Sequence, residues 1–391
     1  MDGAPPDRRT LELLRELIAF PTVSAAPNLD LIRWCAGLLE GAGAEVTLIP
    51  DATGTKANLY ATIGPRDRPG VLLSGHTDVV PAAGQDWTRP PFELTQADAR
   101  LYGRGTTDMK GFVASALAAA LRASEQDLAT PLHLAFSHDE EVGCVGVRSL
   151  IALLAAAPFR PRFCIVGEPT SMRVATGHKG KTAARVTATG RESHSALAPS
   201  ALNAIHMACD MIGFVREIQA EIAQDGARDD GFDVPYTTLH VGVIDGGVAL
   251  NIVPNRARFD FEIRNLPGQD PDAILARLDA RRAAYVADLR QRFPEAAITV
   301  EITNSYPALD TAPEAGVVRL VQGLAGEAAT IKVAFGTEGG LFSSVLGIPT
   351  VVCGPGSMEQ GHKPDEYVTT DQLATCDAMM DALIARLRAG I

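Results

Sequence analysis

Side chains of the types that bind metal ions recur where apolar runs of this chain end. His76 and Asp78 close the run VLLSGHTDVVP, Glu140 and Glu141 follow LHLAFSHD, and Glu168 follows FCIVG. Each run is rich in Val, Leu, Ile or Phe and is typical of a buried strand. Because the loops at the carboxyl ends of strands in an open α/β sheet converge on one crevice, we expect these side chains to meet. Imidazoles and carboxylates gathered there predict a site for divalent metal, with zinc as the first candidate.

The pattern around these runs predicts an α/β fold, with a mostly parallel sheet flanked by helices. Helical periodicity covers 8–19 and 28–42, and an Ala-rich helix follows Asp108. Strands alternating with helices are typical of helices packed on a parallel sheet. The further strands expected in this part are 45–49, 57–63, 71–74, 132–137, 163–166 and 348–353, with a helix at 146–156.

The sequence pattern changes after Gly180, where strands of alternating apolar and polar residues accompany two long helices. KTAARVTATG, TTLHVGVIDGG and RARFDFEIRNL alternate as half-exposed strands do, and helices are expected from Ser200 and over 271–290, before a strand at 297–302. This predicts an α+β domain, inserted at 180–303 and exposing one sheet edge, between two parts of a catalytic domain, 1–179 and 304–391. His178 and Lys179 would lie at the hinge.

Composition excludes several other classes of protein. The formal net charge is −12, and no run of Lys or Arg is long enough for a nucleic-acid patch. The longest apolar stretches are too short to span a bilayer, and the first ten residues lack the apolar segment of a secretory signal. The six cysteines are widely spaced without a CxxC pair, which favours free thiols in a reducing cytoplasm over a disulfide framework.

The candidate residues match what amide hydrolysis requires. A pair of metal ions can polarise a carbonyl and make hydroxide available at neutral pH, and it needs a bridging carboxylate with further His and carboxylate ligands. Glu140, next to a ligand, is a candidate general base, and Asp78 could fix the tautomer of His76. The candidate ligands are His76, Asp108, Glu141, Glu168 and His362.

Each of these residues also has an ordinary structural interpretation. A single His after a strand is more often a polar loop residue than a ligand. Asp108 could cap the Ala-rich helix, Glu168 could simply end a strand, and Asp-Glu-Glu is usually a solvated acidic turn. Their joint occurrence after successive apolar strands favours the metal site.

The motifs SGHTDVVP, GRGTTDMKG, DEEVG, GEPT and GHKPDEYV resemble metallopeptidase family M20, from about residue 10 to the C-terminus. The resemblance implies a zinc-exopeptidase-like fold and two Zn²⁺, for which Co²⁺ could substitute. It implies that His76 and Glu168 hold one ion, that Glu141 and His362 hold the other, and that Asp108 bridges them. It further implies Glu140 as general base, Asp78 as the partner of His76, and a lid domain through which two copies form a homodimer.

The resemblance also implies residues that bind the substrate. His194 would cross the dimer interface to the substrate carbonyl, while Arg264 and Asn251 would contact the substrate carboxylate. Read without the family, His194 is a polar loop residue, and Arg264 forms a surface salt bridge. The segment from Gly336 onward is most similar to the acetylornithine deacetylases of the family: Gly336 and Thr337 would approach the ligand, and Glu338 would pair with a cationic side chain or, alternatively, cap the following helix.

The expected activity is therefore removal of the acyl group from an N-acyl amino acid, with N2-acetyl-L-ornithine favoured, in arginine biosynthesis. Desuccinylation of succinyl-diaminopimelate, or another deacylase or carboxypeptidase activity, is the alternative within the family. A metal-free module that binds acylated amino acids is the alternative outside enzymes. Neither nucleic acid nor membrane is expected as a partner.

Overall fold

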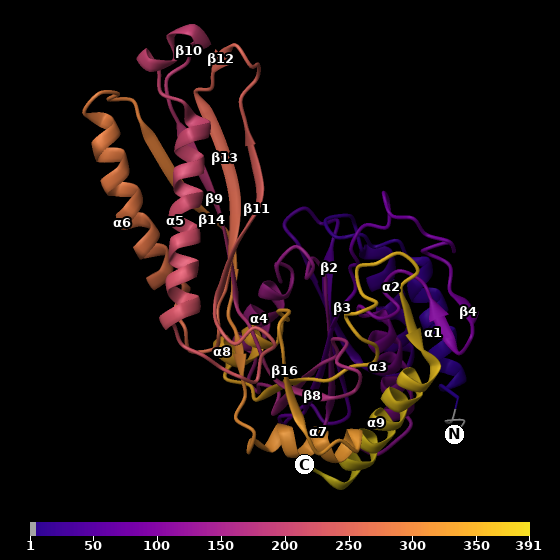
Figure 1. The fold of residues 1–391 in the computed structure, drawn as a ribbon. Helices are drawn as coiled ribbons and strands as arrows, with labels where there is room; N and C mark the ends of the chain where they lie inside the picture. The colour runs from indigo at the N-terminus through magenta and orange to yellow at the C-terminus, as the bar shows by residue number, and fades with distance from the viewer. Residues whose placement is uncertain (1–4) are drawn as a thin grey trace. The chain divides into compact units, whose positions relative to one another are not determined.

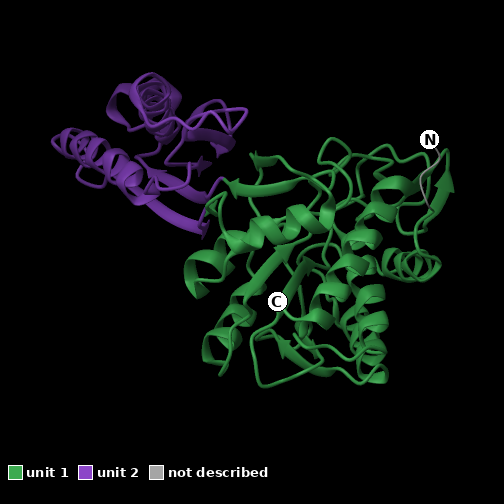
Figure 2. Ribbon diagram, turned by 90° about the horizontal axis from the view of Figure 1, so that it is seen from below, with its two compact units in different colours: residues 1–178, 309–391 green, residues 179–308 purple. Residues whose placement is uncertain are grey.

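The structure is a computed structural model that describes residues 5–391. The chain forms two units, residues 1–178 with 309–391 as unit 1 and residues 179–308 as unit 2 (Figure 2). The first four residues, part of the segment for which we expect no secretory signal, lie outside the described residues. Within the described part, no helix is both long and apolar enough to cross a membrane.

Unit 1 is built on a nine-stranded mixed sheet (Figure 1). Its strands are β1 (Glu45–Pro50), β2 (Ala57–Ile63), β3 (Val71–His76), β6 (Leu132–Ser137), β7 (Phe163–Val166), β8 (Val174–His178), β15 (Leu309–Asp310), β16 (Thr330–Val333) and β17 (Thr350–Val352). The order is β1-β2-β6-β3-β7-β17-β8-β15, with β16 beside β8. The central strands β6, β3, β7 and β17 run parallel, whereas β1 and β2 pair in antiparallel fashion at one edge.

Helices flank both faces of this sheet because its central strands are apolar on both sides. Every residue of β3 and β6 is buried. One group of helices shares the main core cluster with the sheet: α1 (Arg8–Ala19), α2 (Leu29–Gly41), α3 (Lys110–Ala123), α7 (Gly316–Ala325) and α9 (Thr370–Ala389). The helices of a second group, α4 (Val147–Ala156) and α8 (Gly339–Leu346), pack against each other and against strands of the sheet, and they are not part of that core cluster.

A three-stranded antiparallel sheet joins distant parts of unit 1. It consists of β4 (Thr95–Ala97), β5 (Arg100–Tyr102) and β18 (Tyr367–Thr369), in the order β18-β5-β4. The sequence pattern does not predict these strands, because three residues are too few to show alternation. The pairing of β18 with β5 brings the GRGTTD and HKPDE segments together.

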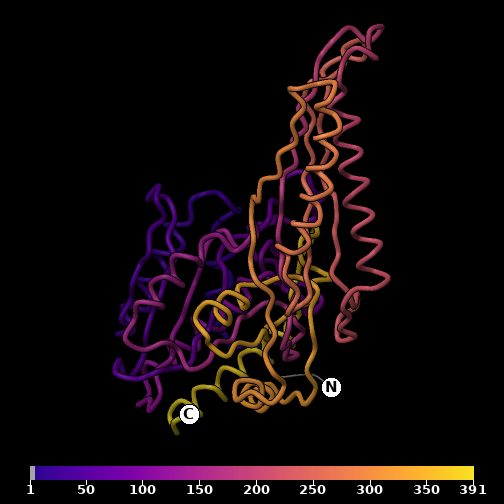
Figure 3. The backbone as a smooth tube through the Cα atoms, turned by 90° about the vertical axis from the view of Figure 1, so that its left-hand side faces the viewer, coloured from indigo at the N-terminus to yellow at the C-terminus, as the bar shows by residue number. Residues whose placement is uncertain are grey.

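Unit 2 is a four-stranded antiparallel sheet with two long helices. Its strands are β9 (Lys181–Thr189), β11 (Thr238–Gly246), β13 (Arg256–Arg264) and β14 (Ala297–Tyr306), in the order β11-β13-β9-β14. The helices α5 (Ala204–Asp225) and α6 (Pro271–Arg290) run along the strands (Figure 1 and Figure 3). Alternate residues of β9 and β13 are buried in a core shared with these helices, as their period of two predicts.

One end of unit 2 carries a small hairpin-like element. Here β10 (Ser193–His194) pairs with β12 (Ile252–Val253), and a short 3₁₀ helix, η1 (Ser195–Ser200), follows β10. Taken together, the helix-flanked mixed sheet and the separate antiparallel sheet confirm the expected fold class.

Candidate metal centre

Three neighbouring strands of unit 1 place candidate ligands at one edge of the sheet. His76 is the last residue of β3, Glu140 and Glu141 follow β6, and Glu168 follows β7. Because β3 lies between β6 and β7 and is parallel to both, their carboxyl ends are adjacent. Asp108 reaches the same place from the loop before α3.

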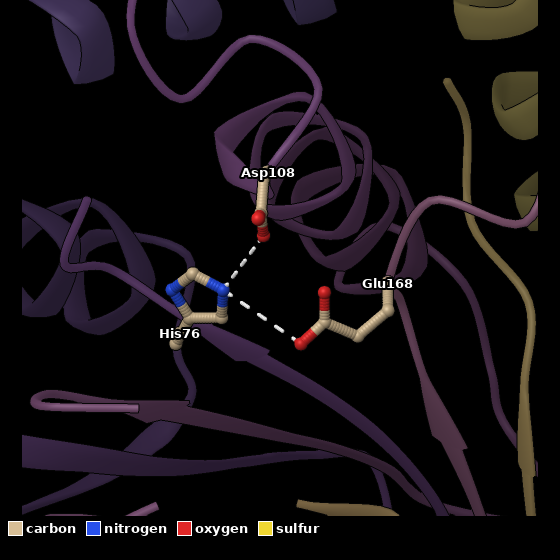
Figure 4. Close-up of side chains that lie close together, drawn as sticks. All are labelled: His76, Asp108 and Glu168. Carbon is tan, nitrogen blue, oxygen red and sulfur yellow. Dashed lines mark hydrogen bonds and ion pairs between the residues drawn. The ribbon is translucent and has the colours of Figure 1, made fainter. Parts of the chain in front are cut away.

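The first ligand group consists of His76, Asp108 and Glu168, all buried. Figure 4 shows the imidazole of His76 facing both carboxylates. The Nε2 atom of His76 lies 3.0 Å from Oδ1 of Asp108 and 3.7 Å from Oε1 of Glu168.

The second group consists of Asp108, Glu141 and His362. The Nε2 atom of His362 lies 3.1 Å from Oδ2 of Asp108 and 3.0 Å from Oε2 of Glu141. The side chain of His362 is 46% exposed, so this group opens to solvent whereas the first does not.

Asp108 belongs to both groups and uses a different carboxylate oxygen in each. It does not cap the Ala-rich helix, which was its alternative interpretation. The residue at the N-cap of α3 is Met109, which makes no side-chain capping bond, and the carboxylate of Asp108 is directed at the two histidines instead.

The electrostatics of the two groups show an excess of buried negative charge. Burial raises the pKa of Glu168 well above its usual range, and the charge of Asp108 adds to the effect. Burial and Asp108 likewise raise the pKa of Glu141. Although burial opposes it, the hydrogen bond with Asp108 raises the pKa of His76, and hydrogen bonds with Asp108 and Glu141 raise that of His362 to about 10.

These residues fit a pair of divalent cations. The donors are imidazole nitrogens and carboxylate oxygens, the set that zinc accepts, and the close carboxylates need positive charge between them. Zn–N and Zn–O bonds of about 2.0–2.2 Å in tetrahedral geometry place ligand atoms roughly 3.3–3.6 Å apart. The separations of 3.0–3.7 Å in the two groups are close to this spacing.

Glu140 lies beside the two groups, yet it belongs to neither. Its side chain is buried, and burial raises the pKa of its carboxyl group to about 8. The thiol of Cys144 donates a hydrogen bond to its Oε1 atom at 3.2 Å. A buried carboxyl with a raised pKa, next to a metal site, is suited to accept and return a proton.

Asp78 contacts His76 in a different way from the one expected. The Nδ1 atom of His76 bonds to the backbone oxygen of Asp78 at 2.9 Å, whereas the Oδ1 atom of Asp78 is 3.6 Å away. The carboxylate of Asp78 instead accepts the backbone N–H groups of Glu140 and Glu141, at 3.1 and 3.3 Å. Asp78 therefore joins the loop after β3 to the turn after β6.

Two side chains of the segment that starts at Gly336 are buried in the structure. Thr337 is buried, and its hydroxyl accepts the N–H of Gly339. The carboxylate of Glu338 is also buried, accepts the hydroxyls of Ser74 and Ser137, and makes no capping bond to α8. The capping alternative is therefore not observed, whereas the pairing of Glu338 with a substrate cation stays a prediction.

The candidate substrate residues of unit 2 fall into two places. His194 is exposed in β10, and the next residue, Ser195, donates its N–H to the backbone oxygen of Asn251 at 2.9 Å, so His194 and Asn251 are neighbours. Arg264 is the last residue of β13, at the other end of the sheet. There its guanidinium bonds to Glu262 at 2.9 Å and to the hydroxyl of Tyr306 at 3.2 Å.

Several residues around the centre were not singled out from the sequence. Asp139, at a positive φ of 55°, accepts the N–H of Ala25 and pairs with Lys56 at 2.5 Å, which holds the turn that carries Glu140. Arg104 and Glu366 form a buried ion pair. One feature of the sequence could have pointed to Asp139, Arg104 and Glu366. They are charged residues inside the DEEVG, GRGTTD and HKPDE segments, and none of them is a candidate ligand.

Replacing Gly167 by Ala tests how tightly the candidate ligand Glu168 is positioned. A Cβ atom at Gly167 would lie 1.9 Å from Cγ of Phe112, so the ring or the backbone must move. We expect a loss of about 1–3 kcal/mol in the free energy of unfolding, as for other overpacked sites, with a loss of activity. Thermal unfolding would measure the first effect. Gly37→Ala is the control, because Gly37 is exposed in α2 with open space around it and Ala should stabilise that helix. Equal stability of Gly167→Ala and the unchanged protein would contradict this packing.

Comparison with known proteins agrees with this geometry. The family model described as peptidase family M20/M25/M40 matches residues 72–386. The chain is 36% identical to an acetylornithine deacetylase of Myxococcus xanthus, over 100% of this chain and 99% of that protein. It is 33% identical to one of Photorhabdus laumondii, over 96% of each. An M20 family metallo-carboxypeptidase from Sulfolobus solfataricus superimposes with a TM-score of 0.78, covering 98% of this chain and 100% of that one, and at 20% identity this likeness concerns the fold alone.

Proposed function

The chain belongs to peptidase family M20/M25/M40, whose members are metal-dependent hydrolases, and on that premise we propose that it removes the acetyl group of N2-acetyl-L-ornithine, a step of arginine biosynthesis. The observation that carries the hydrolytic part is the pair of ligand groups that share Asp108, with Glu140 beside them. The choice of substrate is supported by the similarity to acetylornithine deacetylases over the whole chain.

We assign one ion to His76 and Glu168 and the other to Glu141 and His362, with Asp108 between them. Zinc suits these donors, and cobalt is the expected substitute. When bound, such a pair polarises the scissile carbonyl and makes a nearby water more acidic.

The chain's own residues would supply the remaining steps. Glu140 takes the proton of the attacking water and returns it to the leaving amine, because its carboxyl is buried beside the site and belongs to neither ligand group. Asp78 holds the backbone of Glu140 and Glu141, so the base and the ligand keep their relative positions. The backbone oxygen of Asp78 accepts the Nδ1 proton of His76 and leaves Nε2 for the metal.

We propose further that unit 2 is a lid and that the working protein is a homodimer. His194 and Arg264 lie at opposite ends of the sheet of unit 2, separated by β13, which spans about 26 Å at roughly 3.3 Å per residue. This is far longer than an N-acyl amino acid, so the two residues can serve one substrate only if they come from different chains. The edge strand β11, with Val243 and Ile244 exposed, is a surface through which two lids could pair.

In this proposal Arg264 of one chain and Asn251 of the other, which lies beside His194, bind the substrate carboxylate, and Gly336 and Thr337 line the approach. Arg264 would exchange Glu262 for the substrate, since a guanidinium binds any carboxylate with the same two-pronged geometry.

A panel of acylated amino acids tests the substrate. N-acetyl, N-formyl and N-succinyl derivatives of ornithine, diaminopimelate and neutral amino acids, with dipeptides, would be assayed for released amine. We expect the highest kcat/KM with N2-acetyl-L-ornithine. Preference for N-succinyl-diaminopimelate or for dipeptides would replace the proposed substrate but leave the hydrolytic site intact. Tight binding without any released amine would favour a binding module.

A further inference from the structure

Arg104 and Glu366 form an ion pair whose two side chains are each only 1% exposed. The Nη1 atom of Arg104 donates to Oε2 of Glu366 at 2.6 Å. Removing two charges from water is costly, and such a pair rarely stabilises a fold more than apolar residues of the same volume would. Its presence beside the ligand groups therefore calls for a role besides stability.

Glu366 binds the loop that carries the shared ligand. Its Oε1 atom accepts the backbone N–H groups of Gly105, Thr107 and Asp108, at 3.1, 2.9 and 3.1 Å. Three donors from one turn can converge on one oxygen only if the turn keeps a single conformation. The backbone of Asp108 is thus fixed by a carboxylate that belongs to neither ligand group.

Arg104 extends the same network to the other side of the centre. Its Nη2 atom donates to the side-chain oxygen of Gln85, and the side-chain nitrogen of Gln85 donates to the backbone oxygen of His362 at 2.8 Å. The guanidinium also lies over the ring of Trp87, 4.9 Å from its centroid, which limits its movement. His362 is held in a left-handed backbone conformation, with φ of 63°.

We propose that Arg104 and Glu366, with Gln85, are positioning residues that set the separation between Asp108 and His362 and thereby the affinity of the site for its ions. Asp108 and His362 come from distant segments, and the Arg104 network links the backbones that carry them, in addition to the pairing of β18 with β5. A planar guanidinium suits this task because it can donate to Glu366 and Gln85 at a fixed angle. This inference rests on the proposed metal centre.

The test is the affinity of the full-length protein for Zn²⁺, measured by competition with a chromophoric chelator after the metal is stripped. In Glu366→Gln both binding steps should weaken by about 10–100-fold, as for other partners that orient ligands, because Asp108 belongs to both groups. Arg104→Lys should weaken both binding steps too, since Lys keeps the positive charge but lacks the two guanidinium nitrogens that donate to Glu366 and Gln85. Saturating Zn²⁺ should restore most of kcat in each variant.

Asp377→Asn is the matched control. Asp377 is another buried carboxyl of unit 1 that accepts several hydrogen bonds, from the backbone of Asp7 and the hydroxyls of Thr10 and Ser115. None of these partners is a candidate ligand. Its replacement should lower the melting temperature without changing either Zn²⁺ affinity.

Gln85→Ala keeps the inference testable if the buried variants fail to fold. Gln85 is only half-buried and contacts the backbone of His362, not that of Asp108. Its replacement should weaken only the ion bound by Asp108, Glu141 and His362, and the visible absorption of Co²⁺ at that position should change. The other binding step should stay as in the unchanged protein.

The outcomes separate this inference from the proposed function. Unchanged Zn²⁺ affinities in Gln85→Ala, and in every folded variant of Arg104 and Glu366, would overturn the inference, even if melting temperatures fall as in Asp377→Asn. Failure of the unchanged protein to bind Zn²⁺ would instead overturn the metal centre on which it rests.

Discussion

Replacement of Glu140 by Gln is expected to lower kcat by at least 10²–10⁴-fold, the range for loss of general acid–base catalysis, while both ions stay bound. Gln has the size of Glu and can keep the hydrogen bond from Cys144, but it cannot take the proton of water. Because the same carboxyl would also protonate the leaving amine, the loss should fall on kcat and not on KM.

Steady-state kinetics together with the metal content of the purified variant measures this effect. Glu141→Gln is the matched control, because it changes the neighbouring carboxyl, which lies in a ligand group. That variant should lose affinity for one ion and recover activity with excess Zn²⁺. Loss of metal from Glu140→Gln, with activity restored by excess Zn²⁺, would mean that Glu140 is itself a ligand.

Mixing two inactive variants, His194→Ala and Glu140→Ala, should restore about a quarter of the activity of the unchanged protein. Random exchange makes half of the dimers hybrid, and in each hybrid one of two sites combines an intact Glu140 with a His194 from the other chain; this follows from two-fold symmetry. The recovered activity would be large against each parent, because a donor aimed at the developing charge is worth about 2.7–4 kcal/mol.

Subunit exchange must be shown independently, for example with differently tagged variants. The His194→Ala variant alone, carried through the same mixing procedure, gives the background activity. If exchanged mixtures stay as inactive as their parents, His194 serves its own subunit or has no part in the reaction.

The meeting of three of the candidate ligands could be predicted because it depends on strand order. His76 ends an apolar strand, Glu141 and Glu168 each follow one, and adjacent parallel strands bring their carboxyl ends together. Asp108 lies near His76 and His362 in the structure, but the sequence could not separate a ligand from a helix cap at this position, since both roles put an acidic residue before α3.

The contacts that position the candidate ligands could not be predicted, because they run through the backbone. Asp78 holds the N–H groups of two following acidic residues, and Glu366 holds three N–H groups of the Asp108 loop. Any sequence of suitable length offers those N–H groups, so no residue pattern marks them. Glu338 is a similar case, because nothing in its sequence indicates that Ser74 and Ser137, on two neighbouring strands, donate hydrogen bonds to its buried carboxylate.

Parts of the fold were missed for a related reason. The long, periodic elements such as α6 and β13 lie where the sequence indicates them. The sheet of β4, β5 and β18 is made of three-residue strands whose pairing is set by β18, from the C-terminal part of the chain. Such pairing depends on contacts between distant segments, so it leaves no periodic pattern in the local sequence.

Titration of the stripped protein with Zn²⁺, with hydrolysis of N2-acetyl-L-ornithine followed at each step, tests the account most directly. We predict no hydrolysis without metal, two binding steps per chain, and full activity when both are filled, because both ligand groups share Asp108. Hydrolysis that persists at full rate after the metal is removed, or two bound ions without release of ornithine from any acylated substrate, would contradict it.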